Sequence, residues 1–195
     1  MSGIEHNTVP DPAAAAFELR KTVVMVGMMG AGKTAVGRAL AARLGVPFLD
    51  SDAEIESAAN MSIPEIFARD GEKFFRRKES QVIGRLLNEA RGVLSTGGGA
   101  FLSAENRKMI SERGASVWLN ADLDVLWNRV RHKDTRPLLR TADPRATLSG
   151  LFEARVPFYS QADLTVVSDG DAAIEEMVDR VIAALLTRPD VLRRI

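Results

Sequence analysis

The stretch that decides the fold is residues 22–34, which read TVVMVGMMGAGKT. An apolar, β-branched run ends at Gly27, and Gly32-Lys33-Thr34 follows after four further residues. This is the G-x-x-x-x-G-K-[ST] pattern of a loop whose backbone N–H groups wrap around phosphate groups. In such a loop Lys33 supplies a mobile positive charge for the outer phosphates, and the hydroxyl of Thr34 can bind a magnesium ion.

The residues around this pattern support the same interpretation. A strand-like run precedes the loop, and Val36, Leu40 and Leu44 recur after it at a spacing of four, which is typical of a helix. A helix that begins near Lys33 directs the positive end of its dipole at the bound phosphates. The alternative is a glycine-rich turn that carries a surface lysine, and the strand–loop–helix context argues against it.

The composition excludes several classes of protein. Of the 195 residues, 46% are apolar and 27% are charged, as in an ordinary single α/β domain. Lys+Arg and Asp+Glu both total 26, so no excess charge points to nucleic acid or to a membrane surface. There is no cysteine, which excludes disulfides, thiolate catalysis and cysteine metal sites. We therefore expect a monomeric, cytoplasmic enzyme that acts on small molecules.

Strand-like and helical segments alternate along the chain. The five predicted strands are residues 22–26, 46–49, 92–96, 115–119 and 164–167. This alternation predicts a parallel sheet with helices on both faces, which is a three-layer α/β/α domain. We expect residues 21–195 to form this single domain and residues 1–20 to be a flexible tail, with a short helix around residues 13–19. The end of the chain, from about Thr187, is predicted to fray.

Two aspartates follow the second predicted strand. Asp50 and Asp52 flank Ser51 at the carboxyl end of that strand, where parallel sheets bind ligands. One of the three can simply cap the next helix. Because two aspartates exceed what a cap needs, we expect at least one to act in binding or catalysis. Asp52 suits contact with a substrate hydroxyl, and Asp50 suits holding water on a magnesium ion.

Residues 51–91 are predicted to form helices that help to bind a substrate. Arg76 and Glu79 are three residues apart, so they face the same side of one helix. Arg76 could line a pocket, or the pair could be a surface salt bridge, and the sequence leaves both open. For Arg77 and Lys78 we expect a solvated face.

Three consecutive glycines, Gly97, Gly98 and Gly99, follow the third predicted strand. Three glycines are costly in chain entropy, so they indicate a backbone that must approach something closely, here a small substrate. A flexible turn is the alternative. No acidic residue ends this strand, which argues against motor and AAA-type ATPases.

Residues 129–145 are strongly basic. They hold six cationic side chains against two aspartates, together with two prolines that disfavour a regular element. We predict a mobile lid whose arginines close over the transferring phosphate and exclude water. A solvated loop is the alternative.

Six segments closely resemble, in order, the shikimate kinase family of the nucleoside-monophosphate-kinase-like group of P-loop kinases. They are GMMGAGKTAVG (27–37), FLDSD (48–52), Gly71 with Phe75, Arg76 and Glu79, the three glycines, RPLL (136–139), and Arg155 with Tyr159. The resemblance runs from about Lys21 to the last predicted helix, and it implies a five-stranded sheet of order 2-3-1-4-5. It also implies ATP-dependent phosphorylation of the 3-hydroxyl of shikimate, a step towards chorismate and the aromatic amino acids.

The resemblance further implies roles for individual residues. It places ATP against the phosphate loop and two arginines of the lid, namely Gly30, Ala31, Gly32, Lys33, Thr34, Ala35, Arg129 (against adenine) and Arg136 (against the phosphates). It places shikimate against Asp52, Arg76, Gly98 and Arg155, and the run of glycines adds Gly97 and Gly99 to these substrate residues. Magnesium would be bound by Thr34, with Asp50 in support, and catalysis would rest on Lys33, Asp52 and Arg136.

The chemistry of shikimate, a ring with three hydroxyls and one carboxylate, agrees with these roles. Arg76 and Arg155 suit bidentate capture of the carboxylate. Phosphoryl transfer has a loose transition state, so Asp52 is expected to orient the hydroxyl first and to act as a general base second.

Two other functions remain open. A kinase for gluconate or a nucleotide would share the phosphate loop and the lid, but not the three glycines paired with Arg155 and Tyr159. A non-catalytic nucleotide-binding domain is the second alternative. A GTPase switch would need a guanine-reading N-K-x-D sequence, which is missing, and a degenerate kinase would have lost some of Lys33, Asp52 and Arg136, all of which are present.

Overall fold

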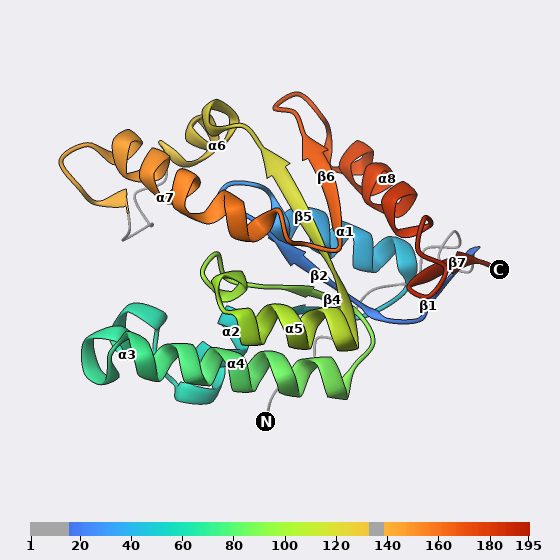
Figure 1. The fold of residues 1–195 in the computed structure, drawn as a ribbon, viewed down its shortest axis with the longest axis horizontal. Helices are drawn as coiled ribbons and strands as arrows, with labels where there is room; N and C mark the ends of the chain where they lie inside the picture. Colours follow the sequence, from blue (N-terminus) through green and yellow to red (C-terminus); the bar gives the residue numbers. More distant parts are fainter. Residues whose placement is uncertain (1–15, 133–138) are drawn as a thin grey trace.

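The computed structural model describes residues 16–132 and 139–195, which form a sheet flanked by helices (Figure 1). The strands are β1 (Phe17–Leu19), β2 (Thr22–Val26), β3 (Phe48–Asp50), β4 (Val93–Ser95), β5 (Gly114–Ala121), β6 (Leu164–Ser168) and β7 (Leu192–Arg194). The helices are α1 (Lys33–Leu44), α2 (Ser51–Ala59), α3 (Ile63–Asp70), α4 (Glu72–Glu89), the 3₁₀ turn η2 (Ala100–Leu102), α5 (Ala104–Arg113), α6 (Leu123–Val130), α7 (Pro144–Tyr159) and α8 (Ile174–Leu185).

Within the described residues, β2 to β6 form one parallel sheet of order β3-β4-β2-β5-β6. Counted along the chain, this is the predicted order 2-3-1-4-5, which is confirmed. β2 lies at the centre of the sheet, and all five of its side chains are buried, as expected for a run of apolar residues covered on both faces. The phosphate loop therefore leaves the middle of the sheet, at its carboxyl edge.

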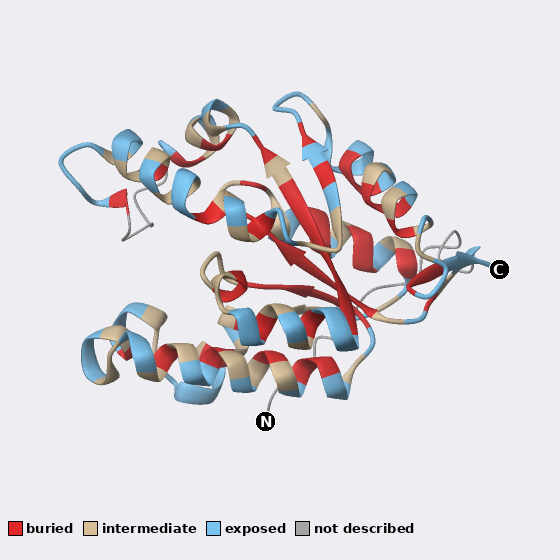
Figure 2. Ribbon diagram, in the orientation of Figure 1, coloured by how far each residue is buried: buried red, intermediate tan, exposed pale blue. Residues whose placement is uncertain are grey.

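The helices cover both faces of the sheet, as predicted. α1 leads from β2 to the edge strand β3, whereas α5 leads from β4 back across β2 to β5. Right-handed crossovers in opposite directions place these two helices on opposite faces. α8 packs beside α1, and α4 packs beside α5 (Figure 1). The buried residues follow the strands and the inner sides of these helices (Figure 2).

The two ends of the described chain differ from the prediction. Phe17–Leu19 is a strand and not a helix, and it pairs antiparallel with β7 at the C-terminus (Figure 1). Residues 16–19 are thus not a tail, and the segment after Thr187 is ordered by this pairing. Each strand has only three residues, which is too few to show the alternation of apolar and polar side chains that predicts a strand. The two strands also lie at opposite ends of the chain, so local sequence does not reveal their pairing. Residues 1–15 lie outside the described residues.

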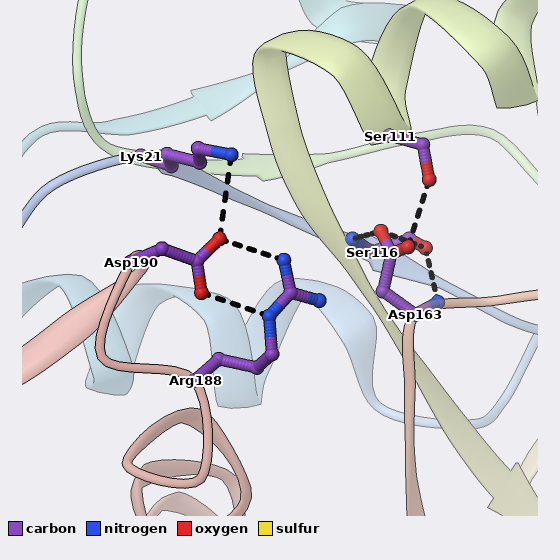
Figure 3. Close-up of polar contacts among 6 residues, drawn as sticks. All are labelled: Lys21, Ser111, Ser116, Asp163, Arg188 and Asp190. Carbon is purple, nitrogen blue, oxygen red and sulfur yellow. Dashed lines mark hydrogen bonds and ion pairs between the residues drawn. The ribbon is translucent and has the colours of Figure 1, made fainter.

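Ion pairs fasten the C-terminal segment to the start of β2 (Figure 3). Arg188 donates twice to Asp190, both times at 2.8 Å, and Lys21 lies 3.4 Å from the same carboxylate. These contacts pull down the pKa of Asp190, chiefly through the hydrogen bonds from Arg188. They lie at the start of β2, whereas the phosphate loop lies at its end.

Asp163 fixes the start of β6 to β5 in the same view (Figure 3). Its carboxylate accepts from the Ser116 backbone N–H at 2.9 Å and from the hydroxyl of Ser111 at 2.7 Å.

Among the described helices, none is both long and apolar enough to cross a membrane.

Candidate active site

The phosphate loop, residues 27–34, connects β2 to α1 and depends on its glycines. Gly27, Gly30 and Gly32 have φ values of 144°, 82° and 94°, which side-chain-bearing residues rarely adopt. At Gly30 a Cβ would also lie only 2.8 Å from Cγ1 of Val130. The loop can therefore adopt its curled path only with glycine at these positions.

The same loop presents positive groups towards its interior. The Lys33 amino group donates to the carbonyl oxygens of Gly27 at 2.6 Å and Met28 at 3.1 Å, so it lies across the loop. α1 begins at Lys33, and no described side chain caps this end of the helix. The first N–H groups of α1 are therefore available to an anion held by the loop.

Asp50 and Asp52 take different places at the end of β3. Asp50 caps α2, because its Oδ1 accepts from the Ala53 backbone N–H at 3.1 Å. The capping function that the sequence left open thus falls to Asp50. Asp52 lies in the first turn of α2, and its Oδ1 is buried without a hydrogen-bond partner among the described residues. An unpartnered buried carboxylate oxygen indicates a group that awaits a donor.

The environment of Asp52 changes its acidity. Burial raises the pKa of Asp52 from 3.8 to about 6, and the charges of Asp50 and Glu79 add to the rise while Lys33 opposes it. Near neutral pH the carboxylate is therefore mostly ionised yet close to its pKa, which suits a group that receives a proton.

Arg76 turns towards the site, and Arg77 does not. The Arg76 guanidinium donates to Oε1 of Glu79 at 2.9 Å and lies 5.2 Å from the ring centre of Phe75. Glu79 is only 1% exposed. Burial raises its pKa, and the charge and hydrogen bond of Arg76 oppose that rise. Of the two alternatives left open for Arg76, the pocket position is the one observed, because the side chain is only partly exposed and lines the cleft. Arg77 is exposed, as predicted.

The three glycines after β4 each meet one of the predicted substrate residues. A Cβ on Gly97 would lie 2.9 Å from both carboxylate oxygens of Asp52. On Gly98 it would lie 2.8 Å from Nη1 of Arg155. On Gly99 the added atom would collide with the guanidinium of Arg76.

These contacts give the glycine triplet, residues 97–99, a definite role. All three positions are crowded by polar side chains, so the triplet is a packed wall and not merely a flexible turn. Together with Asp52, Arg76 and Arg155 it forms a group that we call the candidate acceptor site.

One cleft of about 1430 Å³ joins the phosphate loop to the candidate acceptor site. The predicted site residues that line it are Gly30, Ala31, Gly32, Lys33, Thr34, Ala35, Asp50, Asp52, Arg76, Gly97, Gly98, Gly99, Arg129 and Arg155. The apolar part of its wall includes Ile63, Pro64 and Phe67 from α3. A nucleotide and a small polar ring can therefore share a single enclosure.

The predicted lid is described only in part. Arg129, in the last turn of α6, donates through Nη1 to the carbonyl oxygen of Gly30 at 3.0 Å, so it contacts the phosphate loop. Arg136, predicted to act from the lid, lies outside the described residues, as do all of residues 133–138.

A second wall of the cleft was not predicted. Ser168, Ala172, Ile174 and Met177, at the end of β6 and the start of α8, line the same cleft. The sequence could have indicated this wall, because the fifth predicted strand also ends at the carboxyl edge of the sheet, where ligands bind. The sequence pairs Glu79 with Arg76 on one helix and includes it in the resemblance, but only the structure shows that it is buried and orients the arginine.

Among the described residues, no three His, Cys, Asp or Glu side chains come together as a metal site. A magnesium ion in this cleft would therefore take most of its ligands from phosphate groups and water, as is usual for nucleotide-bound magnesium. Thr34 and Asp50, the two residues predicted to support magnesium, both line the cleft with oxygen-bearing side chains.

The chain is similar to known kinases over most of its length. A family model described as "Shikimate kinase" matches residues 29–186. A protein named shikimate kinase from Ruegeria pomeroyi is 77% identical over 192 residues, 98% of both chains. A shikimate kinase from Acinetobacter baumannii, solved in complex with shikimate, is 38% identical with a TM-score of 0.80, covering 86% of this chain and 93% of that one.

A more distant neighbour addresses the gluconate alternative. The structure of a gluconokinase from Sinorhizobium meliloti covers 89% of this chain and 95% of its own, with a TM-score of 0.60 and 22% identity. At that identity the likeness extends to the fold alone. The family model and the close relatives agree with the geometry of the cleft, and the chain belongs to the shikimate kinase family.

Proposed function

We propose that the protein transfers the terminal phosphoryl group of ATP to the 3-hydroxyl of shikimate, giving shikimate 3-phosphate and ADP. The observation that carries this proposal is the single cleft in which a phosphate loop faces two arginines and a partly buried aspartate. A transferase needs both substrates in one enclosure, because proximity and orientation supply much of the rate.

The phosphate loop binds the donor. Its backbone N–H groups and the first turn of α1 hold the phosphates, and Ala31 and Ala35 leave room for the nucleotide beside Gly30 and Gly32. Lys33 exchanges its two carbonyl partners for phosphate oxygens when ATP binds. Arg129 reaches the nucleotide from α6, with adenine as its partner.

The candidate acceptor site binds shikimate through its carboxylate. Arg76 and Arg155 offer fixed guanidinium groups that suit bidentate hydrogen bonds to a planar anion. Arg155 is only 9% exposed and the partner of Arg76 is buried, so both arginines are held in place before the substrate arrives. The glycine triplet lines the cleft beside these side chains and offers its backbone N–H groups to the ring substituents.

Asp52 orients the attacking hydroxyl and receives its proton. Its unpartnered Oδ1 accepts a hydrogen bond from the 3-hydroxyl, and its raised pKa lets it hold the proton as the new P–O bond forms. Since the transition state is loose, orientation contributes more than basicity.

Magnesium supplies charge neutralisation between the outer phosphates of ATP. Oxygen donors suit this hard cation, and the Thr34 hydroxyl would bind it directly while Asp50 holds one of its waters. Asp50 uses Oδ1 for the cap of α2, which leaves Oδ2 for this contact.

The lid completes the site in this proposal. Arg136 approaches the transferring phosphate, and closure of residues 129–145 excludes water as a competing acceptor. We propose one kinase domain that includes β1 and extends to β7, acting as a monomer in the cytoplasm without a nucleic-acid or membrane partner.

An acceptor panel tests the proposal. The purified protein is incubated with ATP, magnesium and one of shikimate, gluconate or a nucleoside monophosphate, and ADP release is measured by a coupled assay. We expect ADP with shikimate at a rate far above that without an acceptor. ADP formed only with gluconate or a nucleotide would contradict the proposal.

A further inference from the structure

Tyr159, the last residue of α7, lies directly behind the glycine triplet. It is fully buried, and its hydroxyl donates to the carbonyl oxygen of Gly98 at 2.5 Å. Gly98 lines the cleft, whereas Tyr159 is not among the residues that line it. The Gly98 carbonyl therefore points away from the cleft and into the core.

This hydrogen bond fixes the orientation of the peptide that joins Gly98 to Gly99. In a trans peptide the C=O and the following N–H point in opposite directions, and residues 16–132 and 139–195 contain no cis peptide bond. With the Gly98 carbonyl held by Tyr159 on the core side, the Gly99 N–H is directed to the cleft side. Among the described residues, no acceptor is recorded for that N–H. It is a donor aimed at the place where the acceptor substrate would lie.

The same hydroxyl lies next to Arg155. A Cβ on Gly98 would lie 2.8 Å from Arg155 Nη1 and 3.5 Å from the Tyr159 hydroxyl, so both groups crowd one α-carbon. Burial raises the pKa of Tyr159, and the charge and hydrogen bond of Arg155 oppose the rise. The hydroxyl therefore stays protonated at neutral pH, as a donor to Gly98 and a neighbour of Arg155.

The ring of Tyr159 is itself held firmly. Its centre lies 6.2 Å from that of Trp118 on β5, and both side chains belong to the main core. Trp118 in turn lies 3.4 Å from where a Cβ on Gly27 would be. The packing that fixes the tyrosine thus continues to the first glycine of the phosphate loop.

We propose that Tyr159 is a positioning residue of the acceptor site, whose hydroxyl aims the Gly99 N–H into the cleft and seats the Arg155 guanidinium. This inference rests on the proposed function, since it treats the Gly99 N–H and the Arg155 guanidinium as groups that bind shikimate. A purely structural role predicts instead that loss of the hydroxyl lowers stability and leaves the kinetics for each substrate unchanged.

The test is Tyr159→Phe, which keeps the ring and removes only the hydroxyl. Loss of one buried hydrogen bond that orients two ligand groups should raise KM for shikimate roughly tenfold. KM for ATP should change less than about twofold. An unchanged KM for shikimate in a folded variant overturns the inference.

Thr22→Val is the matched control. Thr22 is also a buried hydroxyl that donates to a backbone carbonyl, that of Ala90 at 3.0 Å, but it lies at the start of β2, away from the cleft. The Thr22→Val variant should be destabilised, as Tyr159→Phe is, but its KM for shikimate and its KM for ATP should stay unchanged. If both variants raise KM for shikimate alike, the effect is one of stability, and the inference fails.

A measurement on the unaltered protein covers the case in which Tyr159→Phe does not fold. Tyrosine occurs once in the chain, so ¹³Cζ-labelled tyrosine gives a single resonance. Shikimate should shift it at saturation, because a carboxylate bound by Arg155 changes the charge beside the hydroxyl. No shift while ADP is produced overturns the inference alone, whereas no ADP from the unaltered protein with shikimate overturns the proposed function.

Discussion

The guanidinium of Arg76 donates at 2.9 Å to the carboxylate of Glu79. Glu79 is almost completely buried, and both residues belong to α4 and line the cleft. The next residue, Arg77, is exposed. Two adjacent arginines on one helix thus have opposite surroundings, because neighbours on a helix point about 100° apart. Because Arg76 lines the cleft and Arg77 faces solvent, substitutions of the two residues can be compared as test and control.

Arg76→Ala should raise KM for shikimate by about 10- to 100-fold, since a hydrogen bond to a charged group contributes about 1.5–3 kcal/mol. Arg77→Ala should leave KM within about twofold. Steady-state kinetics with varied shikimate at saturating ATP measure both. Equal effects of the two substitutions would show that the carboxylate does not bind at Arg76.

Asp52→Asn should lower kcat by about 10²- to 10⁴-fold, because the amide can neither accept the proton nor orient the hydroxyl in the same way. ATP binding should survive, since Asp52 contacts the acceptor in this account. Calorimetric titration with ATP and initial-rate assays separate the two effects. Near-normal turnover of the variant would mean that the assigned role is wrong.

The pKa of Asp52 predicts opposite pH dependences of activity and stability. Activity should fall as pH drops through about 6, where the carboxylate becomes protonated. Stability behaves differently, because a carboxyl whose pKa is raised on folding binds its proton more tightly in the folded state, so this group loses stabilising free energy as pH rises from about 4 to about 6.

Asp52→Asn should therefore stabilise the protein at pH 7.5, on the order of 1 kcal/mol once the partial exposure of the side chain is allowed for. The gain should disappear near pH 4. Thermal unfolding of both proteins at the two pH values measures it. A destabilised variant at pH 7.5 would indicate that Asp52 already has a stabilising partner.

Gly99→Ala should raise KM for shikimate, because the added methyl group would collide with the guanidinium of Arg76 and displace it. Gly150→Ala is the control, since Gly150 lies inside α7 and the new carbon would have no atom within 4 Å beyond its chain neighbours and the nearby backbone of its own helix. The control should keep normal kinetics and gain up to about 1 kcal/mol from better helix propensity. Normal KM for shikimate in Gly99→Ala would contradict the placing of Arg76 against the triplet.

Asp190→Asn should weaken the attachment of the C-terminal segment. A carboxylate with a lowered folded-state pKa stabilises the protein above its ordinary pKa and loses this effect as pH falls below about 4. The difference in Tm between the two proteins should therefore be present at pH 7, shrink at acid pH and shrink in high salt, since the side chain is exposed. A difference in Tm that does not change with pH would show that the effect of Asp190→Asn does not come from the charge of the carboxylate.

The sequence was sufficient for the sheet, and it named most of the residues that the structure brings together in the cleft. The apolar run before Gly27 and the alternation of strands and helices predicted the sheet, and the resemblance supplied its order. Asp52 and the glycine triplet could be singled out because each stands in a pattern that exceeds what a cap or a turn needs. Arg76 could equally have been part of a helix salt bridge, and only the resemblance assigned it to the substrate. Their convergence on one cleft needed the structure, because the three segments are distant along the chain.

Other features depend on tertiary contacts that local patterns do not reveal. Whether Asp50 or Asp52 caps α2 is decided by which carboxylate reaches the Ala53 N–H. The pairing of β1 with β7 joins two three-residue strands from opposite ends of the chain. The contact of Tyr159 with Gly98 spans 61 residues, so its sequence motif gave no indication of what the hydroxyl does.

The measurement that tests the central claim most directly is identification of the product by ¹H–³¹P correlation NMR, after reaction of the protein with ATP, magnesium and shikimate. The account predicts one new phosphate ester whose phosphorus couples to the proton on carbon 3 of the ring. A phosphate on another hydroxyl, or only free phosphate beside ADP, would contradict it.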